Sequence, residues 1–437
     1  MFATILPLGA LLSGTALLLL GSGLLGTLLG VRGSYEGYGD QVLGLIMSGY
    51  FLGFFLGTFL APRAIRRMGH IRAFSFFGAL FASTVLAHAI WVTPATWGLL
   101  RVATGLAVVG LYTVIESWLN ATVEGAQRGR VFAVYMVINL AALAIGQQFL
   151  RLAPPESFAL FSLVAILICA AMLPVTATRM TQPVMSPSER LGVRRLFRLA
   201  PAAGVGSLFS GISIGTFWGL APVYAGRLEL DNESVAMFMT VTIVGGALLQ
   251  WPIGRLSDSG DRRRTLAIAS LGAAVAAAAA LFFASPNGVG LYVVYFLYGG
   301  LSFAIYPVAV AHLLDHVAPE DLLPACSTNL LLHGLGAALG PALAGFAMGR
   351  FGPGAFPGML LVIHLLLAAY VASRLLTRTR VAAGDAHFHA MLRTSPTAME
   401  MLPEVDAAQD ELEESIDSTA ADPTEGLAEP EAGIREQ

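Results

Sequence analysis

Twelve apolar segments, each about as long as a membrane-spanning helix, follow one another along the first 376 residues of the chain. A helix of about 20 apolar residues crosses the hydrocarbon core of a bilayer. The chain is 56% hydrophobic and only 12% charged, whereas soluble proteins carry about 25% charged residues. We therefore predict an all-α integral membrane protein with twelve transmembrane helices. The expected spans are residues 5–29, 41–62, 73–93, 97–118, 131–150, 157–176, 200–222, 235–254, 265–284, 289–311, 323–349 and 356–376.

The basic residues, all of them arginine, are distributed unevenly between the loops. Most lie after the even-numbered spans and after the last one, so the positive-inside rule places these loops and both chain ends in the cytoplasm. The arginines on this side are Arg63, Arg66, Arg67, Arg72, Arg128, Arg130, Arg179, Arg190, Arg194, Arg195, Arg198, Arg255, Arg262, Arg263, Arg264, Arg374, Arg378 and Arg380.

The chain divides into two similar parts around a long loop at residues 177–199. Five residue pairs recur at an offset of 194, namely Pro7 with Pro201, Gly21 with Gly215, Gly105 with Gly299, Tyr112 with Tyr306, and Gly146 with Gly340. Such a parallel repeat predicts two pseudo-symmetric six-helix bundles related by an axis along the membrane normal. We assign the bundles to residues 1–176 and 200–380 and a cytoplasmic linker to 177–199.

A short charged loop, residues 254–264, interrupts the apolar sequence between the eighth and ninth expected spans. Its flanks are as long as a bilayer is thick, so we expect a hinge at the membrane surface. Gly254 allows two helices to approach closely, and Asp258 can cap a helix or pair with an arginine. Arg262 and Arg263 complete the charged part of the loop.

This loop resembles the signature of the major facilitator superfamily, Gly-x-Leu-small-Asp-x-x-Gly-Arg-Arg, with Asp261 in place of the second Gly. The chain is most similar to the YcaD-like branch of bacterial transporters in that superfamily. In the first half, Gly69 and Arg72 fit the signature loosely, and Arg66 stands where its Asp would be. The resemblance implies a transporter with the fold of the superfamily, in the inner membrane of a bacterium.

Polar and aromatic residues within the spans are the candidates for a central substrate cavity, because polar groups in hydrocarbon need partners or a water-filled space. Arg101 begins a segment, Arg-Val-Ala-Thr-Gly105, that resembles the Arg-x-x-x-Gly pattern of the fourth helix in the superfamily. Such an arginine faces the cavity in many members; alternatively, Arg101 reaches to the membrane interface. The other cavity candidates are Asn139, Trp218, Tyr298, Tyr306 and His333, although amides and imidazoles also join helices together.

Two acidic residues at helix ends are candidates for a cytoplasmic gate. Glu116 lies about 22 Å along the helix from Arg101, too far for direct pairing, and within reach of the arginines of residues 63–72. We expect a gate ion pair there; the alternative is a carboxylate that couples transport to protons. Asp315, at the end of the tenth span, is either the counterpart gate of the second half or a solvated helix end.

The last part of the chain, residues 381–437, differs in composition from everything before it. It holds 14 acidic residues against two arginines, a composition typical of disorder. We expect a disordered acidic cytoplasmic tail, either a solvated appendage or a partner-binding element.

Taken together, these features predict a transporter that moves a small organic solute, neutral or anionic, by alternating access around a midplane cavity. Coupling to protons is open. The alternative is a non-transporting sensor or scaffold that signals through the acidic tail. We find no pattern for an enzyme active site, a metal, a cofactor or nucleic-acid binding, and we expect a monomer in the lipid bilayer.

Overall fold

The computed structural model describes residues 2–123, 125–178, 183, 191–283, 288–377, 387–391 and 396–402. In these residues, twelve helical segments are long and apolar enough to cross a membrane. The prediction of an all-α protein with twelve transmembrane helices is confirmed. The helices of the first half are α1 (Phe2–Tyr35), α2 (Asp40–Met68), α3 (His70–Ile90), α4 (Pro94–Thr122), α5 (Gly125–Gln148), η1 (Phe149–Leu152) and α6 (Phe158–Ala177).

The second half follows a short helix, α7 (Val193–Leu199), which lies inside the segment expected to be a linker. Leu196 of α7 is buried, and α7 packs against α8. The remaining elements are α8 (Pro201–Arg227), α9 (Asn232–Asp258), α10 (Arg262–Phe283), α11 (Val289–Phe303), α12 (Ile305–Leu314), η2 (Pro319–Asp321), α13 (Leu322–Phe351), α14 (Ala355–Thr377) and η3 (Pro396–Met401).

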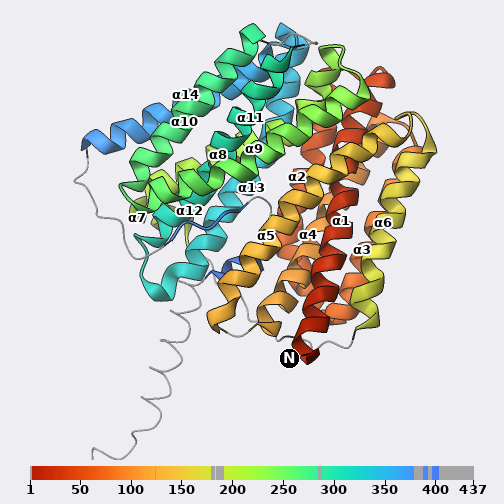
Figure 1. The fold of residues 1–437 in the computed structure, drawn as a ribbon, viewed down its shortest axis with the longest axis horizontal. Helices are drawn as coiled ribbons and strands as arrows, with labels where there is room; N and C mark the ends of the chain where they lie inside the picture. Colours follow the sequence, from red (N-terminus) through yellow and green to blue (C-terminus); the bar gives the residue numbers. More distant parts are fainter. Residues whose placement is uncertain are drawn as a thin grey trace, which may run out of the picture.

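The two halves lie side by side, with α1–α6 on one side of the molecule and α8–α14 on the other (Figure 1). They meet along α2 with α13, α5 with α9, and α1 with α8. We call the end of the bundle that carries residues 63–72 and 254–264 the arginine-rich end. The end that carries residues 36–39 and 228–231 is the opposite end.

The internal repeat appears in the packing of the two halves. A Cβ on Gly105 of α4 would collide with the backbone oxygen of Tyr50 in α2, and a Cβ on Gly299 of α11 would collide with that of Thr242 in α9. Gly146 and Gly340 make a second such pair, against the backbone of α1 and of α8. Glycine permits this close approach of helices in a membrane, where packing holds them together, so the offset of 194 marks equivalent contacts.

The tenth span is broken into two helices, unlike the single helix expected for residues 289–311. Pro307 has no N–H to donate to the carbonyl of Phe303, one turn earlier. The chain leaves α11 at Phe303 and continues in α12 from Ile305. The break brings Tyr306 to the start of α12, where it is buried.

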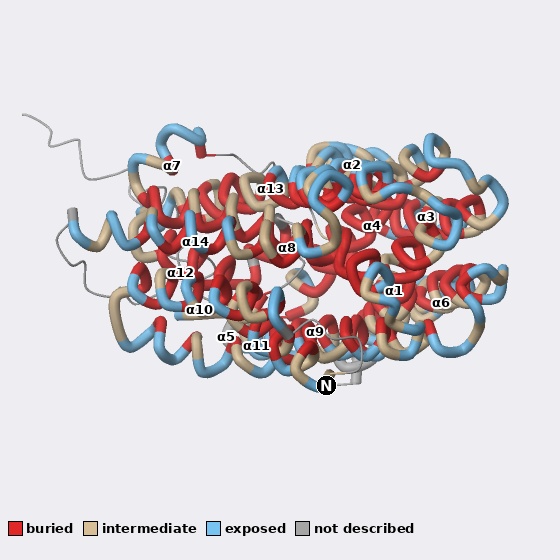
Figure 2. Tube along the Cα trace, turned by 90° about the horizontal axis from the view of Figure 1, so that it is seen from above, coloured by how far each residue is buried: buried red, intermediate tan, exposed pale blue. Residues whose placement is uncertain are grey.

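The burial pattern agrees with a surface that faces lipid. In Figure 2, the buried residues gather on the inner sides of the helices and the exposed ones on their outer sides. Many large apolar side chains are among the exposed residues, such as Leu99, Leu173 and Phe282. Such faces would be costly in water, and they are expected where the surroundings are acyl chains.

The structure differs from the expected disordered tail at residues 387–391 and 396–402. The second of these segments contains the short helix η3, and Met391, Met399 and Met401 are each at most 2% exposed. Burial of these apolar side chains away from water is favourable in free energy. The acidic composition of the tail as a whole gives no sign of this short apolar part. The other residues of the expected tail lie outside the described part of the chain.

Candidate functional site

Direct polar contacts between the two halves gather at the opposite end of the molecule. Arg227 of α8 forms an ion pair with Asp40 of α2, with Nε to Oδ1 at 2.9 Å. Arg151, after α5, pairs with Glu233 of α9. Nearer the middle, the backbone N–H of Ala342 donates to Ser48 Oγ at 3.0 Å. These contacts hold the halves together at this end.

A cavity lies between the halves, farther from the opposite end than these contacts. Its empty space is about 650 Å³, including the open part. The first half contributes one face of α2, and the second half contributes α8, α12 and α13. The lining is mostly aromatic and aliphatic, and comprises Tyr50, Phe51, Phe54, Phe55, Thr58, Ile214, Tyr306, Leu330, Leu331, His333, Gly334 and Ala337.

His333 and Tyr306 supply polar groups to this cavity from the second half. Their rings lie 4.4 Å apart between centroids. Within the described part of the chain, His333 Nδ1 and the Tyr306 hydroxyl are buried and have no hydrogen-bond partner. A buried polar atom without a partner is costly, so a bound solute or water at this place would satisfy both.

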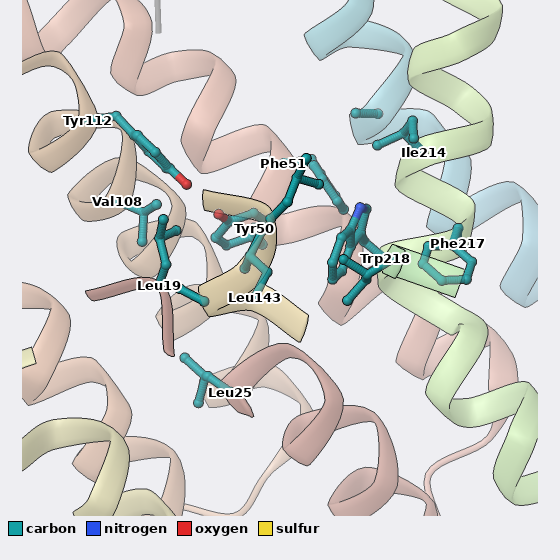
Figure 3. Packing of buried hydrophobic residues seen from close by; sticks show 14 of the residues in the cluster. Leu19, Leu25, Tyr50, Phe51, Val108, Tyr112, Leu143, Ile214, Phe217 and Trp218 are labelled. Atoms are coloured by element: carbon teal, nitrogen blue, oxygen red, sulfur yellow. The ribbon is translucent and has the colours of Figure 1, made fainter. Parts of the chain in front are cut away.

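Arg101 is not among the residues that line this cavity. Its guanidinium stacks on the Tyr50 ring, 4.4 Å from the centroid, and it lines a smaller pocket that also includes Trp218 of α8. Tyr50 and Phe51 line both spaces. Figure 3 shows Tyr50 and Phe51 between the core of the first half and Trp218 of the second. Arg101 is buried in the bundle.

Two of the expected cavity residues lie elsewhere. Tyr298 is inside the second half, where its hydroxyl lies 2.8 Å from Ser213 Oγ in a buried cluster with Ser302 and His364. Asn139 occupies the position equivalent to His333, yet it donates to the backbone oxygen of Tyr135 and lines none of the spaces above. The repeat therefore places equivalent residues in different environments.

The charged loop at the arginine-rich end forms a network in the second half. Arg262 is buried and donates to Asp315 at 2.6 Å and to Asp258 at 2.8 Å. Asp315 is thus a paired, buried group at the end of α12. Arg263 binds Asp261; burial of that carboxyl opposes its ionisation, but the hydrogen bonds from Arg263 outweigh this and hold the pKa of Asp261 below its ordinary value.

The first half has a different arrangement at the same end. Glu116 is fully buried and accepts a hydrogen bond from the Tyr135 hydroxyl at 2.9 Å. Arg66 and Arg72 are exposed, and Gly69 has a φ of +80° between α2 and α3. We expected Glu116 to lie near the surface beside these arginines. In the structure it lies inside the bundle instead.

Known proteins resemble this chain in sequence. Residues 203–402 match the model of the Major Facilitator Superfamily. The resemblance of the chain to this superfamily, predicted from the signature loop, is confirmed. It is 28% identical over 347 residues to the MFS-type transporter YcaD of Escherichia fergusonii, which covers 79% of this chain and 90% of that protein. An MFS-type transporter of Enterobacter sp. (strain 638), Ent638_1421, is also 28% identical, over 85% of this chain and 95% of its own.

Solved structures of major facilitator transporters share the fold. The nucleoside transporter NupG aligns with a TM-score of 0.71 and 14% identity, over 86% of this chain and 100% of that one. A bacterial homologue of the human lysosomal transporter Spinster, in an inward-facing and unoccupied conformation, aligns with a TM-score of 0.65 and 14% identity, over 93% and 95%. These likenesses show that the chain has the fold of these transporters, with twelve helices that can span a membrane.

Sequence reasoning missed the contribution of α2 to the cavity of this transporter. Tyr50, Phe51, Phe54 and Phe55 recur at helical spacing in the second span, a signal for one aromatic face. The same pattern also fits a face that packs on other helices or meets lipid. The Tyr50 face could be assigned to the cavity only after α13 was placed opposite to it.

Proposed function

We propose that this protein moves a small aromatic or amphipathic organic solute, neutral or anionic, through the cavity between α2 and α13 by alternating access. The observation that carries the proposal is the cavity itself, whose lining is mostly aromatic and aliphatic and includes the adjacent rings of His333 and Tyr306, each with a buried polar atom that has no hydrogen-bond partner among the described residues. Few polar groups in an apolar pocket fix the orientation of an organic ligand.

The arginine-rich end faces the cytoplasm in this proposal, as the positive-inside rule requires. The ion pairs of Arg227 with Asp40 and of Arg151 with Glu233 then close the extracellular side. The likeness to a homologue of Spinster described as inward-facing supports this assignment. Transport requires these contacts to break while the halves close at the cytoplasmic end.

Glu116 is the residue we propose for proton binding, in preference to the gate ion pair expected from the sequence. Its carboxylate is fully buried and bonded to Tyr135, whereas Arg66 and Arg72 are exposed. A carboxyl group in such surroundings can exchange a proton as the site changes its access to water. For the second-half network around Arg262 and Asp315 we retain the role of a cytoplasmic gate.

Uptake into liposomes tests the proposal. Purified protein is reconstituted with a pH-sensitive dye inside, and pools of aromatic metabolites and drugs are screened for uptake and proton movement. We expect His333→Ala to lower uptake of the active solute about tenfold or more, the cost of roughly one good hydrogen bond and contact. The matched control is Asn139→Ala, at the equivalent position outside the cavity, which should keep uptake within about twofold of wild type.

The same assay separates the proton and cavity roles. Glu116→Gln should abolish proton movement and leave solute binding intact, and Arg101→Ala should weaken uptake of anionic solutes more than of neutral ones. Equal uptake by wild type and His333→Ala would exclude this cavity as the route. A lack of flux with every pool would favour the sensor alternative.

A further inference from the structure

Two described pieces of the acidic tail, residues 387–391 and 396–402, lie between the two halves at the arginine-rich end. The segment Phe388–Ala390 lines a groove formed by α5 of the first half and α9 of the second. The short helix η3 packs against α4 and α5 of the first half and against α13 of the second. Both described pieces of the tail therefore touch both halves.

The contacts of the first piece, residues 387–391, are specific. The backbone N–H of Phe388 donates to Asp258 Oδ1 at 2.9 Å, and the Phe388 ring lies on Gly254, where any side chain would collide with it. The ring of His389 faces Phe132 of α5, 6.5 Å between centroids at 79°. Phe388 is therefore bound by the glycine and the aspartate of the signature loop, Gly254 and Asp258.

The second piece, residues 396–402, is held by apolar burial. Ala398, Met399, Met401 and Leu402 are each at most 1% exposed and belong to the same buried cluster as the helices of both halves. Methionine adapts to irregular surfaces and suits contacts that form and break. Many acidic residues surround this piece in the sequence, and the exposed Arg63, Arg66, Arg67 and Arg72 lie at the same end of the molecule, so long-range attraction favours docking.

We propose that the cytoplasmic mouth of this transporter is a peptide-binding site whose ligand is the chain's own tail, bound through residues 387–391 and 396–402, and that the bound tail blocks the pathway until it leaves. The inference rests on the proposed transport function. A segment wedged between α4, α5, α9 and α13 obstructs the mouth of the cavity. It also keeps the halves apart at the end where alternating access requires them to close, so the docked tail holds the transporter in one state.

Labelling of a cysteine in the cavity tests this proposal without any knowledge of the solute. Full-length protein carries Cys169→Ala and Cys326→Ala, and Thr58→Cys in the cavity lining reports access of a bulky maleimide. We expect Met399→Asp with Met401→Asp to raise the labelling rate about tenfold, because two buried charges expel the segment. The matched control places the same charges at Ala407 and Ala408, downstream of the buried piece, and should leave the rate within about twofold of the parent.

Two further measurements separate release of the tail from damage to the fold. A synthetic peptide of residues 387–402, added to the Met399→Asp, Met401→Asp protein, should restore slow labelling, which it could not do for a misfolded protein. Phe388→Ala, which removes one ring, should give an intermediate rate. The protein that carries the Thr58→Cys reporter and an unchanged tail gives the reference labelling rate.

The outcomes distinguish this proposal from the proposed transport function. An unchanged labelling rate in Met399→Asp, Met401→Asp, with solute uptake intact, overturns the tail proposal and leaves transport standing. Faster labelling that the peptide reverses, in a protein that moves no solute, supports the tail site and overturns transport. Faster labelling that the peptide fails to reverse also overturns the tail proposal.

Discussion

Arg262 donates a hydrogen bond from Nε to Asp315 Oδ2 over 2.6 Å, which joins the start of α10 to the end of α12. Both side chains are at most 3% exposed. Removing one partner of a buried ion pair leaves the other charge buried without full compensation. The network also includes Asp258, so it fixes three helix ends of the second half relative to one another.

Loss of Asp315 should therefore destabilise the protein. For Asp315→Ala we expect a loss of about 3 kcal/mol, at the lower end for a buried pair because Asp258 still binds Arg262. The measurement is the thermal unfolding midpoint of the purified protein in detergent. Asp321→Ala is the matched control, since Asp321 pairs with the largely exposed Arg195 at the same end and should cost about 1 kcal/mol or less. Equal shifts for the two variants would contradict the prediction.

A methyl group at Gly105 should be poorly tolerated. Gly105→Ala would force α4 away from the backbone of Tyr50, and overpacking of this kind costs about 1–3 kcal/mol or more. Gly98→Ala lies in the same helix, where an added Cβ meets open space, and should be neutral or slightly stabilising because alanine favours helix. Folded yield after detergent extraction and the unfolding midpoint measure both. Similar yields for the two would argue against the close contact.

The ion pairs at the opposite end should set the balance between the two access states. Each is partly exposed, so together Asp40→Asn and Glu233→Gln should weaken closure by about 1–2 kcal/mol, and raise opening at that end up to about tenfold. A maleimide applied to that side of the membrane, with Thr58→Cys as reporter, measures the opening. Glu36→Gln breaks the pair of Glu36 with Arg32, which lies within the first half and does not join the halves. It should leave the rate unchanged; a rise there as well would mean that charge loss alone drives the effect.

The start of α9 should show a simple pH dependence. Asp231 caps this helix by accepting from the backbone N–H of Ser234, and that hydrogen bond holds the pKa of Asp231 below its ordinary value. A lowered pKa means that the stabilisation is complete above the ordinary carboxyl range, about pH 4, and is lost as pH falls through the lower folded value. Asp231→Ala should cost about 1 kcal/mol near pH 7.

The control for this prediction is Asp231→Asn, because asparagine also caps helices and does not titrate. The stability difference between wild type and Asp231→Ala should shrink in acid, whereas that between Asp231→Asn and Asp231→Ala should stay constant. Unfolding midpoints at pH 7 and at the lowest pH that the detergent-solubilised protein tolerates give both differences. A wild-type difference that grows in acid would contradict the sign.

The twelve spans and the repeat could be predicted from the sequence because each rests on a strong local signal. Hydrocarbon requires long apolar helices, and the Gly105–Gly299 pair marks a contact between backbones that few other residues allow. The break at Ala304 was missed, although Pro307 indicates one, because prolines in membrane helices often bend the helix without ending it.

The lining of the cavity could be predicted only in part. Whether a residue lines it depends on which helices face one another across it. His333 and Tyr306 line it and Tyr298 does not, although all three are mid-span polar or aromatic residues of the second half. Burial of Glu116 beside Tyr135 was equally hidden, because distance along a helix gives depth but not the neighbours. The docked tail could not be inferred because its few methionines are diluted among acidic residues.

The shared glycine contacts of the two halves are those expected if a six-helix unit was duplicated and joined. Such a duplication leaves two copies of every wall position, and only one copy needs to preserve an interaction with the solute. Asn139 turns to its own helix while His333 faces the cavity, which is divergence of this kind. A change of solute during evolution of this branch would therefore be recorded mainly in α12 and α13, and sequence comparisons between relatives should find their specificity differences there.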